Sequence, residues 1–238
     1  MITLRELVQR AHAALRRRGW EIRRSIPIWP SLLGAEKMPV RTVIDVGAFN
    51  GDTAQILRRW FPAAAILACK PQPIPFRQMQ RWSATKRNVH VRPYAVGRSD
   101  GEMTLHSYPT MPRHSSAYAF ATHPHTHPQQ AFLTVPVRRL DGIVAEAGVA
   151  GPYFVKIDVE GAELDVIAGA HDTLRQTTAC IVKIHMDTMF TCQPTLGQLI
   201  DALGPHGLKY AGNLLQRPAA IGTASADALF VTHSLGTA

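Results

Sequence analysis

From residue 41 onward, short β-branched apolar runs alternate with segments whose apolar residues recur at helical spacing. The apolar runs predict strands, which we place at residues 42–47, 63–69, 88–96, 153–160, 179–186 and 227–233. The helically spaced segments predict helices at residues 52–61, 75–84, 162–174 and 194–207. Strands that alternate with helices indicate βαβ units, so the sequence predicts an α/β fold with a doubly wound, mostly parallel sheet.

The first part of the chain has a different pattern, with apolar residues on one side of a predicted basic helix: Leu4, Leu7, Val8, Ala11 and Leu15. Residues 1–24 contain seven arginines and two glutamates, a net charge of +5 out of +9 for the chain. Such a helix suits a peripheral membrane surface, a nucleic acid, an acidic partner or a second subunit, or it packs on the domain with its arginines in solvent. We predict an amphipathic helix and linker over residues 1–39 and one domain over residues 40–238.

Length and composition are typical of a soluble protein with one sizeable core, because 46% of the 238 residues are hydrophobic. Charge or proline interrupts every apolar stretch well before the ~20 residues that cross a bilayer, and no signal-peptide pattern is present. We therefore expect a cytoplasmic protein. The three cysteines are odd in number and widely spaced, which fits neither a disulfide framework nor a zinc site.

Residues 98–137 interrupt the alternation with Gly, Ser, Pro and five histidines, and they predict a short hairpin and a loop. His123, His125 and His127 alternate along this segment, and His114 lies nearby. Imidazole is a common metal ligand, but no cysteine or carboxylate lies near these histidines. We interpret the cluster as a polar loop and expect no metal site.

A glycine-containing turn, VIDVGAFNGDTA at residues 43–54, follows the first predicted strand. Gly47 and Gly51 permit a tight turn in which backbone N–H groups approach a ligand, and Asp45 places a carboxylate at the strand end. Asp52 and Thr53 are candidates to cap the helix that follows. Taken alone this motif is weak, because a helix packed closely on a strand also requires small residues.

A second motif is far more specific: FVKIDVEGAELDVIAGA at residues 154–170, with its core KIDVEGAE. The chain also contains four further motifs: PYAVG at 93–97, VRRLDG at 137–142, MFTCQPTL at 189–196 and ADALFV at 226–231. In these motifs the chain resembles the FkbM family of S-adenosylmethionine-dependent methyltransferases over roughly residues 40–232. The resemblance implies a Rossmann-like class I methyltransferase fold for residues 40–238.

The resemblance also implies which residues contact S-adenosylmethionine. The turn around its amino acid end corresponds to Asp45, Gly47, Ala48, Asn50 and Gly51, followed by Asp52 and Thr53, and the ligand ammonium can pair with Asp45. The loop that flanks the adenine corresponds to Tyr94, Ala95 and Val96. SSAY at residues 115–118 is interpreted as shaping the acceptor pocket.

Two lysines depart from the family pattern. The family has Glu-Pro after its second strand, where the glutamate accepts both ribose hydroxyls, but this chain has Lys70-Pro71 within ILACKPQP. Related chains also carry glutamate at the position of Lys183. Either the pocket is rearranged or the lysines weaken cofactor binding, because a charged lysine has no acceptor. A further alternative is that Lys70 extends to solvent while a neighbour such as Gln72 replaces the glutamate.

The resemblance places the methyl-transfer site at the end of the fourth family strand, where Lys156, Asp158 and Glu160 project. Asp158 is also expected to contact the cofactor. A base is needed only if the acceptor is a hydroxyl, and the candidates are Asp158, Glu160 and His185. His185 can equally be a hydrogen-bonded core residue. Glu163 opens the next predicted helix and is interpreted as structural, because its charge suits the helix dipole.

The implied activity is O-methylation of a hydroxyl on a small molecule, sugar or polyketide-type acceptor. The alternative is a catalytically impaired protein with a methyltransferase fold and a binding or interaction role. Lys70 and Lys183 favour this alternative. A nucleotide-binding oxidoreductase would need a Gly-x-Gly-x-x-Gly turn, which DVGAFNGDTA lacks. No nucleic-acid partner is expected, because the arginine excess lies mostly outside the domain. A homo-oligomer is compatible with the sequence.

Overall fold

The computed structural model describes residues 38–108, 115–121, 131–218 and 223–232. All of them belong to one compact unit, Leu33–Ala238. The amphipathic helix predicted within residues 1–39 and the histidines predicted to form a polar loop, His114, His123, His125 and His127, lie outside the described residues. Among the residues described, no helix is both long and apolar enough to span a bilayer.

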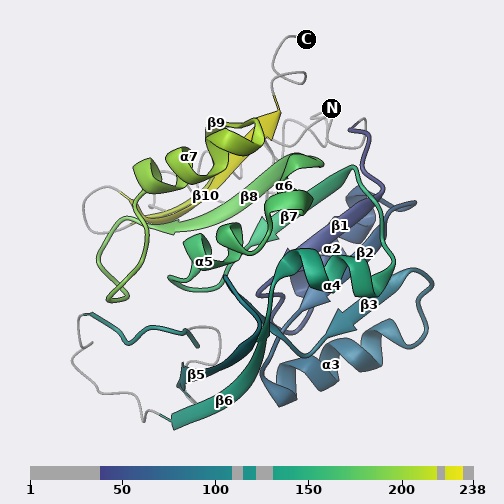
Figure 1. Cartoon of the computed structure of the whole chain (residues 1–238), viewed down its shortest axis with the longest axis horizontal. Coiled ribbons are helices and arrows are strands. Elements are labelled where there is room, and N and C mark those ends of the chain that lie inside the picture. The colour runs from purple at the N-terminus through teal and green to yellow at the C-terminus, as the bar shows by residue number, and fades with distance from the viewer. Residues whose placement is uncertain (1–37, 109–114, 122–130, 219–222, 233–238) are drawn as a thin grey trace, which may run out of the picture. The chain divides into compact units, whose positions relative to one another are not determined.

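A seven-stranded sheet forms the centre of the fold, in the order β3-β2-β1-β7-β8-β10-β9 (Figure 1). Its strands are β1 (Thr42–Val46), β2 (Ala65–Cys69), β3 (Val89–Arg92), β7 (Tyr153–Ile157), β8 (Thr177–His185), β9 (Leu208–Pro218) and β10 (Thr223–Thr232). β3, β2, β1, β7 and β8 are parallel, whereas β10 runs antiparallel between β8 and β9. The predicted doubly wound, mostly parallel sheet is therefore confirmed.

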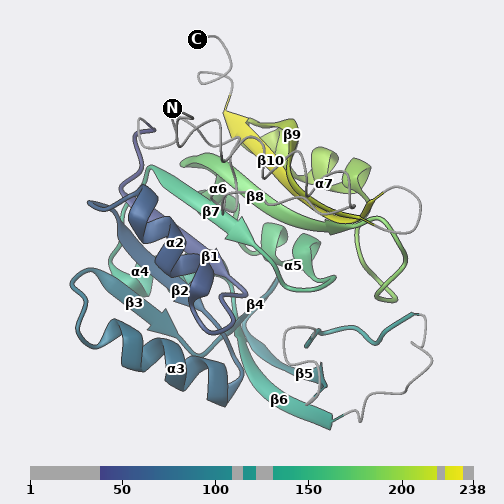
Figure 2. The same ribbon diagram turned by 180° about the vertical axis from the view of Figure 1, so that it is seen from behind.

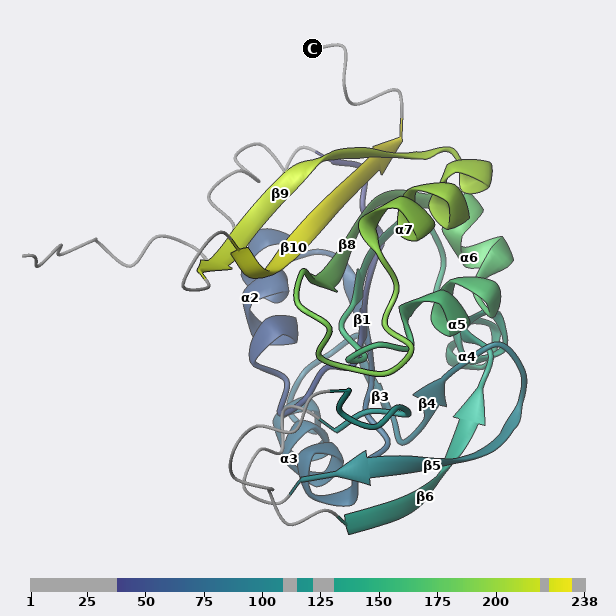
Figure 3. The same ribbon diagram turned by 90° about the vertical axis from the view of Figure 1, so that its left-hand side faces the viewer.

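Helices cover both faces of this sheet, as the edge view in Figure 3 shows. One face carries α2 (Asp52–Trp60) and α3 (Pro73–Ser83), which lie in front in Figure 2. The other face carries α4 (Leu140–Ala147), α5 (Glu163–Ala168), α6 (His171–Arg175) and α7 (Leu196–Leu203). Every residue of β1 and β7 is buried as a result, which explains why these strands are nearly continuous apolar runs.

The strand predicted at residues 88–96 is divided in two. After β3, Pro93 cannot donate a backbone hydrogen bond, and the chain leaves the central sheet. β4 (Ala95–Val96) joins a second sheet with β5 (Gly101–Ser107) and β6 (Ala131–Arg138), in the order β4-β6-β5. β5 and β6 pair antiparallel, which confirms the predicted hairpin.

Three further elements differ from the sequence prediction. The helix predicted at 162–174 is two short helices that meet at Gly169, where an added Cβ would lie 2.0 Å from the Gly97 carbonyl oxygen. The prediction omitted α4 and also β9, whose interior contains Gly212 and Asn213, both weak strand formers. β9 forms because its backbone pairs along β10.

Candidate active site

A cavity that is partly open to solvent lies at the carboxyl ends of β1, β2 and β7. The chain order of the strands reverses at β1, and ligands of doubly wound sheets bind at such a switch point. The second sheet closes the cavity with Met103, Leu105 and Ser115. Among the residues that the sequence analysis assigned to cofactor or acceptor binding, the cavity brings together Gly47, Lys70, Tyr94, Ala95, Val96, Ser115, Ala117 and Asp158.

Gly47 has φ +87°, and a Cβ there would lie 1.8 Å from the Asp158 carbonyl oxygen. The close approach of these two backbones therefore requires glycine. The backbone N–H groups of Gly47 and Ala48 donate to the Cys69 carbonyl, at 3.1 and 3.2 Å. The prediction that the turn directs its N–H groups toward a ligand is wrong for these two residues, because β2 already uses them.

The start of α2 also differs from the prediction. Asp52 is the first helical residue rather than the cap, Gly51 occupies the cap position, and no side chain caps from there. Instead Asn50 Oδ1 accepts from the Asp52 N–H at 3.3 Å. Asn50, Asp52 and Thr53 do not line the cavity wall, so the structure gives them a place beside the turn rather than in the pocket.

Asp45 is fully buried in β1, and neither of its carboxylate oxygens has a hydrogen-bond partner among the described residues. Burial, helped by the nearby Asp158 carboxylate, raises its pKa to about 6 against the opposing effects of Lys156 and Lys70. An unpartnered buried carboxylate is unfavourable by itself. Its position immediately before the cavity wall at Val46 suits a cationic group of a ligand.

Lys70 ends the second strand and does not extend to solvent, because only 6% of it is exposed. Its Nζ lies 5.9 Å from the centroid of the Phe49 ring. Burial lowers its pKa to about 8, although Asp158, Glu160 and Asp45 act in the opposite direction. The alternative in which Lys70 reaches solvent is therefore wrong.

Lys183 lies outside the cavity wall, whereas Lys70 lines it. Its Nζ pairs with Glu160 Oε1 at 3.1 Å and with Asp158 Oδ1 at 3.4 Å. Asp158 Oδ2 also accepts from Lys156 Nζ at 2.8 Å. Burial alone would raise the pKa of Asp158, but the two lysines outweigh it and the pKa is lowered. Asp158 is thus a firmly ionised carboxylate and a poor proton acceptor.

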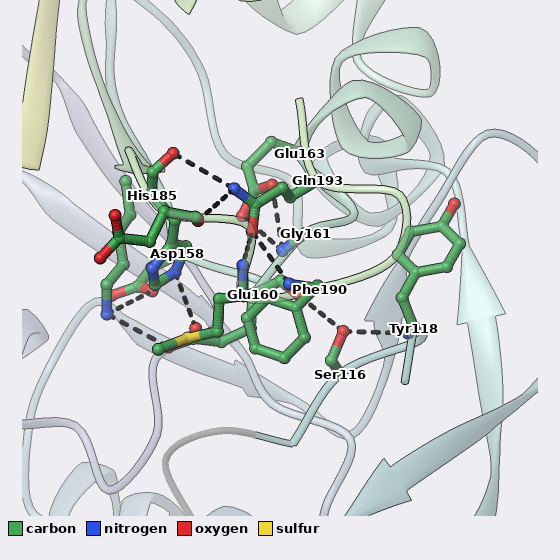
Figure 4. Close-up of polar contacts among 12 residues, drawn as sticks. Ser116, Tyr118, Asp158, Glu160, Gly161, Glu163, His185, Phe190 and Gln193 are labelled. Atoms are coloured by element: carbon green, nitrogen blue, oxygen red, sulfur yellow. Dashed lines mark hydrogen bonds and ion pairs between the residues drawn. The ribbon is translucent and has the colours of Figure 1, made fainter. Parts of the chain in front are cut away.

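Glu160 and His185 extend this network of side-chain contacts, with Glu160 Oε2 and His185 Nε2 3.0 Å apart (Figure 4). Glu160 has φ +58°, an uncommon value for a residue other than glycine, and the Ser116 hydroxyl donates to its carbonyl oxygen. The His185 side chain is 5% exposed. The structure therefore brings Lys156, Asp158, Glu160 and His185 together, but of these four only Asp158 lines the cavity.

Glu163 supports the loop rather than the reaction site. Both of its carboxylate oxygens accept from the Gly161 N–H, at 3.1 Å each. Burial raises the pKa of Glu163 to about 7. This geometry fits a structural role for Glu163. The hydrogen bond from the Gly161 N–H stabilises the Glu163 carboxylate in addition to the helix dipole.

The segment at 115–121 pairs with the segment at 189–191, which the sequence analysis did not foresee. Phe120 and Phe190 form an isolated bridge, and their rings stack with centroids 5.1 Å apart. Gln193 Oε1 accepts from the backbone N–H groups of Met189 and Phe190, and its Nε2 donates to the His185 carbonyl (Figure 4). No local pattern reveals these contacts, because they join segments about seventy residues apart.

No cluster of three or more metal-ligating side chains occurs within the part of the chain that the structure describes.

When the seven strands of the central sheet are numbered in chain order, their order across the sheet is 3-2-1-4-5-7-6. Only the seventh strand, β10, runs antiparallel to the others. This topology, with a cavity at its switch point, defines a class I methyltransferase fold. Residues 45–212 match the Methyltransferase FkbM domain. The chain belongs to the FkbM methyltransferase family, whose cofactor is S-adenosylmethionine.

Two curated relatives are similar in sequence. Methyltransferase 1 of Beauveria bassiana (strain ARSEF 2860) is 31% identical over 145 residues, covering 55% of this chain and 58% of the relative. The chain thus spans less than two thirds of the length of that relative. The 2-O-methyltransferase NoeI of Sinorhizobium fredii (strain NBRC 101917 / NGR234) is 22% identical over 194 residues, covering 75% of this chain and 77% of the relative.

Solved structures show a more distant similarity. The 1,6-didemethyltoxoflavin-N1-methyltransferase of Burkholderia thailandensis aligns with a TM-score of 0.47 and 13% identity, covering 94% of this chain and 80% of its own. Fibrillarin of Aeropyrum pernix aligns with a TM-score of 0.48 and 14% identity, covering 92% of this chain and 73% of its own.

Proposed function

We propose that this protein transfers a methyl group from S-adenosylmethionine to a hydroxyl of a small molecule, such as a sugar or a polyketide-type compound. The observation that carries the proposal is the buried Glu160–His185 pair beside the cavity, at 3.0 Å. Transfer to a hydroxyl needs a base, and a carboxylate that orients an imidazole is a common way to build one. The name of the relative NoeI, a 2-O-methyltransferase, supports the same class of acceptor.

The residues in and immediately beside the cavity fit the cofactor. Asp45 supplies a buried, unpartnered carboxylate for the ammonium of the amino acid end. Tyr94, Ala95 and Val96 supply a largely apolar wall for the adenine. Gly47 keeps the end of β1 free of a side chain. When bound, S-adenosylmethionine supplies an electrophilic methyl group on a sulfonium.

In the proposed reaction His185 accepts the proton of the acceptor hydroxyl, which makes the oxygen a better nucleophile. The bound cofactor would supply the methyl group to that oxygen, with S-adenosylhomocysteine as the co-product. Glu160 holds the imidazole in place and stabilises its protonated form. Lys183 holds Glu160 from the other side, at 3.1 Å. Asp158, paired with Lys156 and Lys183, orients polar groups in the cavity rather than removing protons.

The acceptor enters, in this proposal, beside the second sheet. Met103, Leu105 and Ala117 give that side of the cavity an apolar surface, and Ser115 adds a polar group. Such a wall suits a small organic molecule with a hydroxyl at one end. No nucleic-acid acceptor is proposed, and a helix within residues 1–39 and its contacts with a membrane or subunit stay predictions.

The test is methyl transfer from labelled S-adenosylmethionine to a panel of sugars and hydroxylated polyketides, with the products identified by mass. We expect an O-methylated product and S-adenosylhomocysteine in equal amounts. Products methylated only on nitrogen or carbon would contradict the proposal.

Lys70 favours a second candidate, a binding protein with impaired methyl transfer. A buried ammonium at the cofactor cavity disfavours a cationic sulfonium. Calorimetric titration separates the candidates: tight binding of S-adenosylhomocysteine together with turnover supports the enzyme. Acceptor binding without turnover, even at saturating S-adenosylmethionine, supports the binding protein.

A further inference from the structure

Lys70 and Gln72 lie on either side of Pro71, where β2 ends and α3 begins, and both line the cavity. The Lys70 backbone N–H donates to the Arg92 carbonyl at 3.0 Å, and the Gln72 carbonyl accepts from the Phe76 N–H at 3.0 Å. These bonds to β3 and within α3 fix the backbone on both sides of the proline. The backbone of both residues is therefore held at the edge of the cavity that they line.

Gln72 provides a hydrogen-bond acceptor without a partner. It is 7% exposed, and its Oε1 has no hydrogen-bond partner within the described part of the chain. An unpaired buried amide oxygen is unfavourable, because it has lost its hydrogen bonds to water. A ligand hydroxyl in the cavity would satisfy this atom.

Lys70 provides hydrogen-bond donors without a partner. No hydrogen bond or ion pair joins its Nζ to another described residue, although it is as buried as Gln72. With a pKa of about 8 the side chain is mostly protonated at neutral pH, so it offers three donors and no acceptor.

Ribose presents two neighbouring hydroxyls, and each can either donate or accept a hydrogen bond. A glutamate at the end of β2 could only accept from both. The structure assigns a different division of these bonds to this chain: Gln72 Oε1 accepts from one ribose hydroxyl, and Lys70 Nζ donates to the oxygen of the other. This inference rests on the proposed function, because it concerns the ribose of S-adenosylmethionine.

The first experiment measures binding of S-adenosylhomocysteine by calorimetry to the full chain and to Gln72→Met, Lys70→Glu and the double variant. Methionine keeps the size of glutamine and removes its acceptor. We expect Gln72→Met to raise the Kd about tenfold, as for the loss of one hydrogen bond. In the Lys70→Glu background, where a carboxylate can accept both hydroxyls, the same change should raise the Kd less than threefold. Gln78→Met, on the exposed side of α3, is the matched control.

The second experiment compares the 2′-deoxy and 3′-deoxy forms of S-adenosylhomocysteine. Each should bind the wild-type chain more weakly than the parent ligand. Gln72→Met should bind one of the two deoxy ligands as tightly as it binds the parent ligand. That deoxy ligand lacks the hydroxyl that donates to Gln72 in the wild-type chain. Apo melting curves show whether each variant is folded.

An equal loss from Gln72→Met in both backgrounds would indicate a packing role and overturn the assignment. The assignment would also be overturned if both deoxy ligands bound Gln72→Met more weakly than the parent ligand by the same factors as in the wild-type chain. In both cases binding to the wild-type chain would leave the proposed methyl transfer intact. Absence of binding to every variant, Lys70→Glu included, would overturn the proposed function together with this inference.

Discussion

The carboxylate of Glu160 and the imidazole of His185 lie 3.0 Å apart, although one side chain comes from the loop after β7 and the other from the end of β8. The left-handed backbone of Glu160 turns its side chain toward β8, where Lys183 and His185 project from the same face of the strand. One carboxylate therefore holds both side chains. This arrangement is the basis of the proposed base.

Removal of either partner should slow methyl transfer to a hydroxyl. We expect His185→Asn and Glu160→Gln to lower kcat about 100-fold, the usual contribution of a general base. The Kd of S-adenosylhomocysteine should change less than threefold, because neither side chain is among those proposed to hold the cofactor. Steady-state kinetics and calorimetry measure the two effects separately. His90→Ala, in β3, is the control, and a similar loss of rate there would contradict the assignment.

Gly47 should tolerate no side chain. In Gly47→Ala the new Cβ overlaps the Asp158 backbone oxygen at 1.8 Å, and φ is +87°. We expect the free energy of unfolding to fall by about 3 kcal/mol or more, measured by urea denaturation. Gly148→Ala is the matched control, because φ is +64° there but nothing lies within 4 Å of the added atom. Its loss should be about 1 kcal/mol, and equal losses at both sites would show that backbone overlap is unimportant.

Lys70 should destabilise the protein in the absence of ligand. Its pKa falls from 10.5 to about 8 on folding, so the unfolded chain binds more protons between these values. The buried Lys70 therefore lowers the free energy of unfolding by about 3 kcal/mol at pH 7, and this loss diminishes as pH rises from about 8 toward 10.5. Lys70→Met should therefore melt roughly 5 °C higher than the wild-type chain at pH 7.

The difference in melting temperature between Lys70→Met and the wild-type chain should narrow above pH 8. Melting curves from pH 7 to 10 test this, with the exposed Lys86→Met as the control. A difference that does not change with pH would mean that Lys70 is not a buried cation. Saturating S-adenosylhomocysteine should reduce or reverse the difference, because Lys70 is proposed to bind the ribose.

Cofactor binding should release a proton from Asp45. Burial raises its pKa to about 6, so the carboxyl is about half protonated at pH 6. An ammonium group paired with Asp45 would lower that pKa and expel the proton. Calorimetry of S-adenosylhomocysteine at pH 6, in buffers with different ionisation enthalpies, should show release of about half a proton. The release should disappear in Asp45→Asn; persistence there would assign it to another group.

Much of the fold could be predicted because β1, β2, β7 and β8 are buried on both faces and read as apolar runs. Other elements could not be predicted because their stability comes from partners. β9 contains poor strand formers but pairs with β10, and α5 ends at Gly169 because the Gly97 carbonyl occupies the space of a side chain. Local preference does not report such contacts.

The sequence by itself determined the family, the parallel sheet and the placement of Asp45, Lys70, Asp158 and His185 at the ends of strands. Parallel strands end at the same edge of a sheet, so local patterns suffice to bring these residues to one region. Only the tertiary structure decided that Lys70 is buried, that Lys183 pairs with Glu160, and that Gln72 has an unpartnered oxygen. Those outcomes depend on the register between strands and on single loop conformations, which no periodicity in the chain records.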